Sequence, residues 1–268
     1  MRIPRRELEV HIGTLLVRGS SGLHVDFKAE KSLKPEPNTC ELTIHNLTAA
    51  SRNSLLETAA PVVSIFAQGV SVFYGQVAHV VHERADATTI ATRVSTSDGG
   101  DKVQTARIKK SFGPRAKTGA VLRAIVKELG VDVGNLAATA KRLDSGEATY
   151  AEGVSLNGSA AYELTALCRS AGLEWSIQDG VLQLLNVGEA LKQTAIVLRP
   201  DALLNTPSVS SAGIVAGKTF LQAGLFPGRQ VQIHSEFVDG AYRLEKCTYV
   251  GNTSSDEWSV DFEAKGKL

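Results

Sequence analysis

The N-terminal hundred residues alternate between apolar and polar side chains with a period of two. The alternation is clearest in Glu7–Arg18, His24–Ala29 and Cys40–His45. Successive side chains of a β-strand point to opposite faces of a sheet, so each run predicts a strand with one buried and one wet face. Further strands are predicted at Val62–Gln68, Val70–Val81 and Asp86–Ser97.

Helical spacing of apolar residues interrupts this pattern three times. Each predicted helix begins at a residue whose hydroxyl can accept a backbone hydrogen bond and ends at a proline or glycine. The three pairs of start and stop residues are Thr48 with Pro61, Thr118 with Gly130, and Ser159 with Gly172. The stretch Asp132–Gly153 has little pattern and predicts a loop or weak strands.

Strand patterns return in the second half of the chain. Asp179-Gly180, between two short apolar runs, predicts a tight hairpin because this dipeptide accepts the positive φ angles of a primed turn. Asp239-Gly240 predicts a second such turn. The C-terminal strands are expected at Lys218–Leu225, Val231–Phe237, Tyr242–Val250 and Trp258–Ala264.

The order of these elements predicts a mainly β fold with an α+β insertion. We expect two similar small β-barrels of the tail-tube type plus a central α/β domain. The first barrel is predicted to span residues 1–98. The second is predicted to combine 99–112 with 194–268, and the inserted α/β domain to span 113–193.

Composition limits the classes of function. Lys plus Arg number 29 and Asp plus Glu 28, which argues against tight wrapping of nucleic acid, since that requires a strong excess of basic residues. The hydrophobic fraction of 43% is ordinary for a globular protein, and no apolar run approaches a membrane span. The opening MRIPRRELEV lacks the apolar core of a signal peptide, so we expect a protein without membrane insertion.

The three cysteines form no CxxC pair, and an odd number fits a disulfide framework poorly. Cys40 and Cys168 each lie on the apolar side of their predicted element. We therefore expect Cys40, Cys168 and Cys247 to be buried thiols of a protein that folds in a reducing cytosol.

Two short motifs resemble known sites but have the wrong spacing. Ala212–Thr219 reads AGIVAGKT, and a phosphate-binding loop would need glycine where Ala212 stands and a helix after Thr219. His79, His82 and Glu83 resemble a zinc-protease motif, but the histidines are three apart on a predicted strand and face opposite sides. Neither motif predicts a cofactor or a metal.

Four histidines lie on the polar side of their predicted strands. His11, His24, His45 and His234 all fall on the polar side, where they could build a metal or proton site or simply be wet polar residues. We favour the wet alternative, because a site would also need an organised second shell.

No arrangement of residues predicts catalysis. Trp175 and Trp258 are expected to face inward, and Lys109, Lys110, Arg115 and Lys117 to form a solvated basic loop. No carboxylate pair can be singled out for glycoside hydrolysis. The sequence therefore predicts a protein with no catalytic, cofactor-binding or metal residues.

Three segments together resemble one family. Thr39–Leu56 (TCELTIHNLTAASRNSLL) resembles a strand, Asn-Leu and short helix of phage hub proteins. Val154–Leu185 resembles their strand, helix and Trp-containing hairpin, and Leu225–Ala264, with its Phe-Pro-Gly-Arg turn, resembles their closing barrel. The family is the baseplate hub proteins of contractile-tailed phages, related in fold to the N-terminal part of type VI secretion spike proteins.

This resemblance implies a structural role without enzymatic activity. A hub of this kind is a homotrimer in which two barrels per copy form a pseudo-sixfold ring, matching the hexameric tail tube on one side and the trimeric spike on the other. Its other partners would be baseplate wedge and tape-measure proteins, and DNA would pass through without specific binding. It would reside in the virion, in the tail baseplate, after assembly in the bacterial host cytoplasm.

Three alternatives remain open. A distal tail ring or tube-initiator protein would form a hexamer rather than a trimer. A carbohydrate-binding tail module would need exposed aromatic residues in a groove, and aromatics make up only 6% of the chain. A cell-wall hydrolase would need a catalytic site, and the sequence offers none that we recognise.

Overall fold

The computed structural model describes residues 7–59, 61–146, 149–222 and 224–267. The chain forms two compact units. Unit 1 comprises residues 1–32, 38–98 and 190–268, and unit 2 comprises 33–37 and 99–189. Residues 1–6 of the predicted first barrel and 147–148 of the weakly patterned stretch lie outside the described residues.

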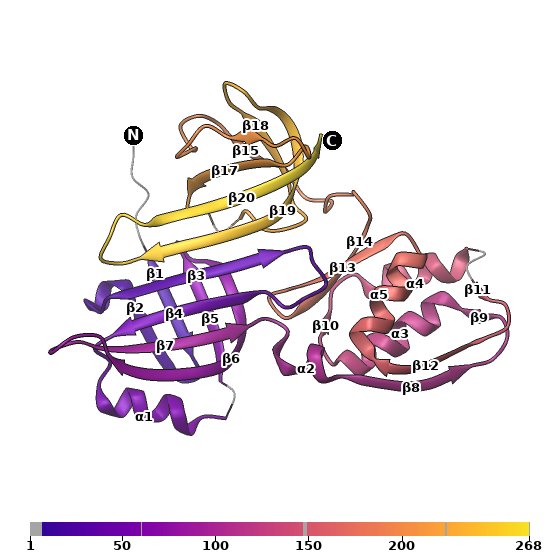
Figure 1. The fold of residues 1–268 in the computed structure, drawn as a ribbon, viewed down its shortest axis with the longest axis horizontal. Helices are drawn as coiled ribbons and strands as arrows, with labels where there is room; N and C mark the ends of the chain where they lie inside the picture. Colours follow the sequence, from indigo (N-terminus) through magenta and orange to yellow (C-terminus); the bar gives the residue numbers. More distant parts are fainter. Residues whose placement is uncertain (1–6, 60, 147–148, 223, 268) are drawn as a thin grey trace. The chain divides into compact units, whose positions relative to one another are not determined.

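The N-terminal half of unit 1 is a curled antiparallel sheet (Figure 1). Its strands lie in the order β3-β4-β7-β6-β5-β1-β2. Thr48 caps the helix as predicted, accepting a hydrogen bond from the Ser51 backbone N–H at 3.1 Å. The elements of this half are β1 (Leu8–Ile12), β2 (Leu15–Arg18), η1 (Gly19–Ser21), β3 (Val25–Ser32), β4 (Thr39–His45), α1 (Ala49–Glu57), β5 (Val62–Ala67), β6 (Val70–Arg84) and β7 (Ile90–Ser97).

The C-terminal half of unit 1 is built in the same way. Its strands lie in the order β16-β17-β20-β19-β18-β15. The long hairpin of β19 and β20 corresponds to the hairpin of β6 and β7 in the N-terminal half. The elements are β15 (Ile196–Leu198), β16 (Ser208–Val209), β17 (Val215–Phe220), β18 (Gln230–His234), β19 (Asp239–Asn252) and β20 (Trp258–Lys267).

The two halves repeat one strand order. In the N-terminal half the sheet order is β3-β4-β7-β6-β5, and in the C-terminal half it is β16-β17-β20-β19-β18. Numbered along the chain, the five strands of each half therefore lie in the same order, first-second-fifth-fourth-third. All four pairings within each set are antiparallel. The halves differ at their outer strands, because β1 pairs with β5 antiparallel whereas β15 pairs with β18 parallel.

The halves meet where β19 pairs with β3, from Lys246 opposite Ser32 to Asn252 opposite Asp26. We call this pairing the seam. The first residues of β19 pair with β18 rather than with β3. Between Tyr242 and Lys246, where the partner of β19 changes from β18 to β3, the register of β19 against β20 shifts. A bulge increases local twist and bends a strand, which lets β19 belong to both halves.

A single apolar core fills unit 1. Alternate residues of each strand point into it, so that Val10, Phe27 and Leu42 in the N-terminal half and Tyr249 and Phe262 in the C-terminal half are all buried. At about 25 cal/mol for each Å² of apolar surface removed from water, such burial is the main force that closes the sheet.

Unit 2 is an α+β body with its own core. Helices α3 and α5 pack together and bury an apolar stripe from each, with Trp175 of the hairpin against them. Trp175 Nε1 donates to Thr165 Oγ1 at 3.0 Å. The elements are α2 (Gly100–Thr105), β8 (Arg107–Phe112), β9 (Ala116–Lys117), α3 (Thr118–Leu129), β10 (Asp132–Val133), α4 (Leu136–Ser145), β11 (Thr149–Tyr150), β12 (Val154–Ser159), α5 (Ala160–Ser170), β13 (Leu173–Gln178) and β14 (Val181–Asn186).

The structure confirms a mainly β chain with a helix-containing insertion but differs from the predicted bounds at three places: residues 33–37 and 99–112 belong to unit 2, and residues 190–193 belong to unit 1. Residues 99–112, which the sequence assigned to the second barrel, belong to unit 2. The physical reason is that β8 pairs with β12 over six residues, from Phe112 opposite Val154 to Arg107 opposite Ser159, and Ile108 enters the core of unit 2.

Several predicted elements also need correction. The run Glu7–Arg18 is a hairpin, because Gly13 adopts φ 57° and turns the chain between β1 and β2. Asp239-Gly240 begins β19 rather than forming a turn, and the turn lies at residues 235–238. Thr118 is the first residue of α3 rather than its N-cap, which is Lys117, whereas Ser159 caps α5 as predicted.

Candidate functional site

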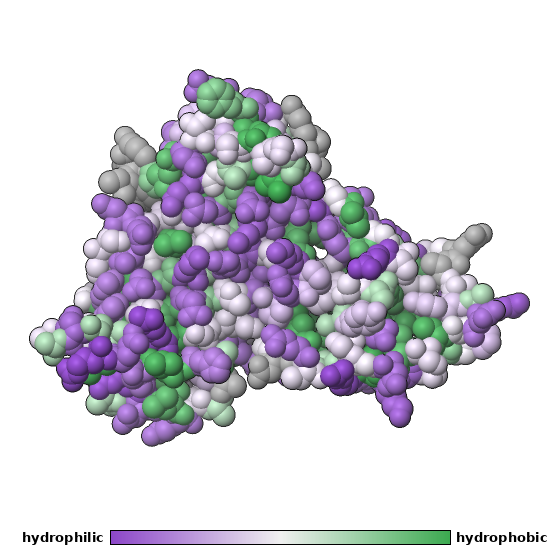
Figure 2. Space-filling view, in the orientation of Figure 1, coloured by the Kyte–Doolittle hydropathy of each residue, from purple (hydrophilic) through white to green (hydrophobic). Residues whose placement is uncertain are grey.

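One continuous polar face covers six adjacent strands of unit 1, in the order β17-β20-β19-β3-β4-β7. One row across it runs through Lys218, Asp261, Thr248, Glu30 and Thr39, each opposite the next. These residues alternate along their strands with the buried residues of the core, which fixes their outward direction. Figure 2 shows mainly hydrophilic and intermediate side chains over β20, β19, β3 and β4.

Charges of both signs are mixed on the polar face. Glu30 contacts both Lys28, at 2.6 Å, and Lys246, at 3.2 Å. The Lys28 and Lys246 ammonium groups hold the pKa of the Glu30 carboxyl below its ordinary value, against a smaller opposing effect of burial. Lys218 lies 3.6 Å from Asp261. The polar face is therefore wet and charged without a large field of one sign.

Two of the predicted histidines meet on the polar face. His24 directly precedes β3 and lies opposite His45 of β4, whose backbone N–H donates to the His24 carbonyl at 2.9 Å. Their rings stack with centroids 4.2 Å apart and planes 7° apart. Asp26 Oδ2 lies 3.1 Å from His45 Nε2 and 3.7 Å from His24 Nε2. Asn252, at the end of β19, places Oδ1 3.2 Å from His24 Nε2.

The sequence did not reveal this cluster. His24 and His45 were on the predicted polar side, but Asp26 and Asn252 were not singled out. Asn252 is 228 residues from His24 along the chain, and only the seam brings them together. A signal was present in the spacing of His24 and Asp26, since residues two apart on a strand share a face.

The other two predicted histidines do not join this cluster. His11 hydrogen-bonds Glu9 at 2.6 Å, and His234 hydrogen-bonds Asp239 at 3.0 Å, each beside a single carboxylate. The hydrogen bond from His11, followed by that from Arg18, holds the pKa of Glu9 below its ordinary value despite the desolvation that opposes it.

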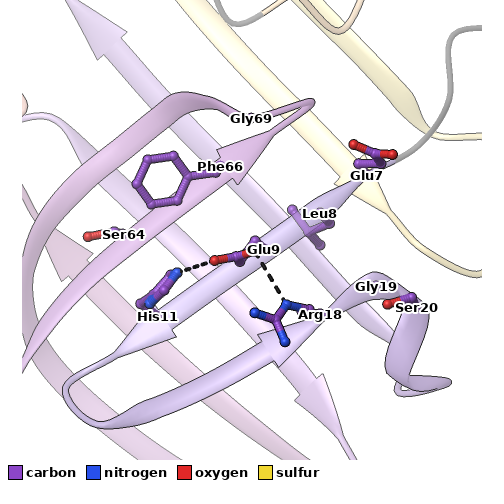
Figure 3. A pocket seen from close by; sticks show the side chains of 10 residues that line it. All are labelled: Glu7, Leu8, Glu9, His11, Arg18, Gly19, Ser20, Ser64, Phe66 and Gly69. Carbon is purple, nitrogen blue, oxygen red and sulfur yellow. Dashed lines mark hydrogen bonds and ion pairs between the residues drawn. The ribbon is translucent and has the colours of Figure 1, made fainter.

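Glu9, His11 and Arg18 line a pocket of about 750 Å³ on β1, β2 and β5 (Figure 3). The His11 ring meets Phe66 edge to face, with centroids 5.8 Å apart. Three polar side chains of this pocket contact one another, because Glu9 accepts from both His11 and Arg18 (Figure 3). The arrangement resembles a closed surface network more than a ligand site.

The two motifs with incorrect spacing, Ala212–Thr219 and the pair His79 and His82, form ordinary turns and strands. Gly213 turns the chain with φ 72°, and the following residues form β17, where Lys218 pairs with Asp261. On β6, His79 is opposite Ser95 and His82 opposite Thr92, so the two histidines face opposite sides as predicted.

The three cysteines are buried, as predicted, with free thiols. Burial raises the pKa of Cys168 and of Cys247 to about 12 and raises that of Cys40 further still. Because the thiolate is the nucleophile, these pKa values make the native thiols unreactive near neutral pH.

Both tryptophans face inward, with Trp175 and Trp258 only 3% and 4% exposed. The most exposed described aromatic residues are Tyr162 on α5 and Phe237 in the turn before β19, and they lie in different units. Among the described residues, none of the helices has the length and apolar character needed to span a membrane.

Comparison with known proteins identifies the fold. No protein-family model and no curated protein matches the sequence. The 43 kDa tail protein of prophage MuSo2 from Shewanella oneidensis matches with a TM-score of 0.68 at 11% identity, covering 97% of this chain and 96% of that chain. A tail protein from Neisseria meningitidis MC58 matches with a TM-score of 0.67 at 11% identity, covering 97% and 96%. The chain has the fold of these phage tail proteins.

The same tail-protein fold extends to secretion systems. The E. coli c3393 protein, a component of the type VI secretion system with structural similarity to the T4 tail proteins gp27 and gp5, matches with a TM-score of 0.66 at 11% identity. That match covers 97% of this chain and 77% of c3393. The resemblance stated from the sequence is thereby confirmed at the level of the fold over nearly the whole chain.

Proposed function

We propose that this chain is the hub of a phage-tail baseplate, a homotrimer that joins a hexameric tail tube to a trimeric spike. The observation that carries the proposal is the repeated strand order of unit 1. If each half acts as one small barrel, three copies present six similar barrels in a ring. Such a ring offers sixfold symmetry to the tube and threefold symmetry to the spike.

The polar face supports a channel role. A sheet with one buried and one wet face suits the wall of a water-filled lumen. The polar face spans strands of both halves across the seam, so each copy would contribute one continuous section of the wall. Its mixed charges and the near balance of the whole chain favour DNA that slides through without binding.

The strand edges support side-by-side assembly. β2 and β16 lie at the two ends of the long strand order, and exposed edges tend to pair with other chains unless they are covered. A ring of copies would cover them. In this role the chain is a mechanical adaptor without enzymatic activity, located in the virion baseplate after assembly in the host cytoplasm, with wedge and tape-measure proteins as further neighbours.

The test is assembly with the tail-tube and spike proteins encoded beside this chain. We expect co-expression to give a ring containing three copies, measured by native mass spectrometry, with a sixfold outline in electron-microscopy class averages. A ring of six copies would instead make the chain a distal tail ring or tube initiator. Failure to bind either neighbouring protein would overturn the hub role altogether.

A further inference from the structure

The cluster of His24, Asp26 and His45 has the features of a metal site that the fold comparison does not assign. The three ligand atoms all lie within 4.8 Å of one another. A tetrahedral ion with bonds of about 2.0–2.1 Å would require ligand atoms roughly 3.3 Å apart. The measured separations of 3.1 Å and 3.7 Å from Asp26 Oδ2 to the two histidine nitrogens bracket that value.

The pairing of β3 with β4 brings the three residues together. Asp26 lies on β3 and His45 on β4. His24 is the residue before β3; the His45 backbone N–H holds it opposite His45, and its ring lies against the His45 ring and near Asp26. The stacked rings bring both Nε2 atoms to the side where Asp26 lies. The backbone therefore keeps the three residues together, and binding one ion requires the two stacked rings to rotate until both Nε2 lone pairs converge on it.

Asn252 completes the surroundings of the cluster. Its Oδ1 faces His24 Nε2 and also accepts the backbone N–H groups of Ser254 and Ser255 at 2.8 Å and 3.0 Å. These two bonds hold the amide oxygen in place beside His24 Nε2, where it can approach an ion as a fourth ligand once that nitrogen binds the metal instead of the amide. Because Asn252 ends β19, an ion here would tie both halves of unit 1 together at the seam.

We propose that His24, Asp26 and His45 bind a divalent transition metal of the zinc class. Two imidazole nitrogens and one carboxylate oxygen are donors that suit Zn²⁺, whereas Ca²⁺ and Mg²⁺ prefer oxygen ligands alone. The side chains of His24, Asp26 and His45 are 36%, 39% and 19% exposed, so an ion and its remaining water can enter from the polar face.

The experiment is a zinc titration of the full chain after treatment with a chelator, followed by calorimetry. We expect one Zn²⁺ per chain, no binding of Mg²⁺, and a higher melting temperature with zinc than without. His45→Gln and Asp26→Asn should each weaken zinc binding tenfold or more. His234→Gln is the matched control, since His234 pairs with Asp239 alone at 3.0 Å and should leave binding unchanged.

Two further measurements distinguish loss of the metal site from loss of folding. The metal-free melting curve of each variant is compared with that of the wild type, and Co²⁺ is added to the wild type as a visible-absorption probe of tetrahedral nitrogen and oxygen coordination. Absence of zinc binding by the wild type would overturn the proposal. So would an equal loss in His234→Gln, or binding retained in both His45→Gln and Asp26→Asn.

Discussion

Asp86 organises the tip of the β6–β7 hairpin through one carboxylate oxygen. That oxygen accepts the backbone N–H groups of Thr88 and Thr89, each at 2.8 Å, and the Thr88 hydroxyl at 3.0 Å. These bonds, led by the Thr88 backbone N–H, lower the pKa of Asp86 from its ordinary value of 3.8 to about 2. Three donors to one exposed carboxylate are enough to favour its charged form strongly.

The lowered pKa makes the tip sensitive to acid. Since the folded pKa lies below the unfolded one, the contribution of Asp86 is fully present above about pH 4 and is lost as the pH falls through about 2. We expect the Asp86 carboxyl carbon to titrate near 2 by NMR, and Thr88→Ala to raise that midpoint by removing the hydroxyl donor. A midpoint near 4 in the wild type would contradict the hydrogen-bond arrangement.

Gly75 allows a close approach between β6 and β7. A Cβ added there would lie 2.6 Å from the Ser97 carbonyl oxygen and 2.9 Å from Phe73 Cε1. The nearest atom belongs to the backbone and cannot easily move aside, so Gly75→Ala should lower the free energy of unfolding by about 1–3 kcal/mol, the usual cost of overpacking. Urea denaturation of the wild type and the variant would measure this difference in unfolding free energy.

The control for this substitution is Gly19→Ala in the same unit. The nearest heavy atom to an added Cβ at Gly19 is 3.4 Å away, an ordinary contact. We expect its effect to stay within about 1 kcal/mol, as for a glycine whose site accepts alanine. Equal losses in the two variants would show that close packing at Gly75 is not what excludes a side chain.

At the scale of elements, Asn38 and Asp98 join the points where the chain leaves unit 1. Asn38 donates its backbone N–H and its amide Nδ2 to Asp98 at 2.8 Å each, and its Oδ1 accepts the Ser32 N–H at 2.7 Å. Both residues are only 4% exposed. Residues 32, 38 and 98 border the insertions that form unit 2, so this network holds the ends of β3, β4 and β7 together.

Removing the Asn38 side chain should therefore be costly. Asn38→Ala removes the buried amide bond to Asp98 and the part-buried bond to the Ser32 N–H, and we expect a loss of about 2–4 kcal/mol of unfolding free energy. Asn205→Ala is the matched control: Asn205 also accepts a backbone N–H, from Lys218 at 2.7 Å, but is exposed. We expect it to cost about 1 kcal/mol or less. Calorimetric melting measures the loss of unfolding free energy in both variants. A similar loss in Asn38→Ala and Asn205→Ala would refute the role given to the buried Asn38 network.

The elements also show which features of the sequence were informative. Strong alternation predicted β3, β4 and β20, because each has one face in the core and one in water. Helix α4 was not predicted, although Asn135 stands at its N-cap; in the structure the Asn135 amide makes no capping bond and instead bonds the backbone of Leu184. The local pattern could not reveal a side chain committed to a distant strand.

The candidate site was less predictable than the fold. Periodicity placed His24 and His45 on the polar side, but it could not say that the two strands are neighbours in this register. Pairings such as β19 with β3 join residues more than two hundred positions apart, and no local spacing encodes them. The assignment of 99–112 to the second barrel was wrong for the same reason, since the pairing of β8 with β12 decides it.

At the scale of the whole molecule, the charge of the polar face can be tested against DNA. The formal net charge is +1, and the polar face carries acidic and basic groups side by side. Without an excess of basic residues there is no net release of counterions from phosphates to drive binding. We expect the wild type to show no shift of duplex DNA in a gel at physiological salt.

Reversing two charges on the polar face should create DNA binding. Glu41→Lys with Glu263→Lys changes exposed residues of β4 and β20 and raises the formal charge from +1 to +5, two for each reversal. Glu57→Lys with Glu152→Lys makes the same change at exposed positions on α1 and in unit 2. If the polar face is the surface that DNA would meet, only the first pair should bind strongly, with affinity that falls steeply as salt increases. Equal binding by the two pairs would mean that net charge alone governs the interaction, and binding by the wild type would contradict a channel through which DNA slides freely.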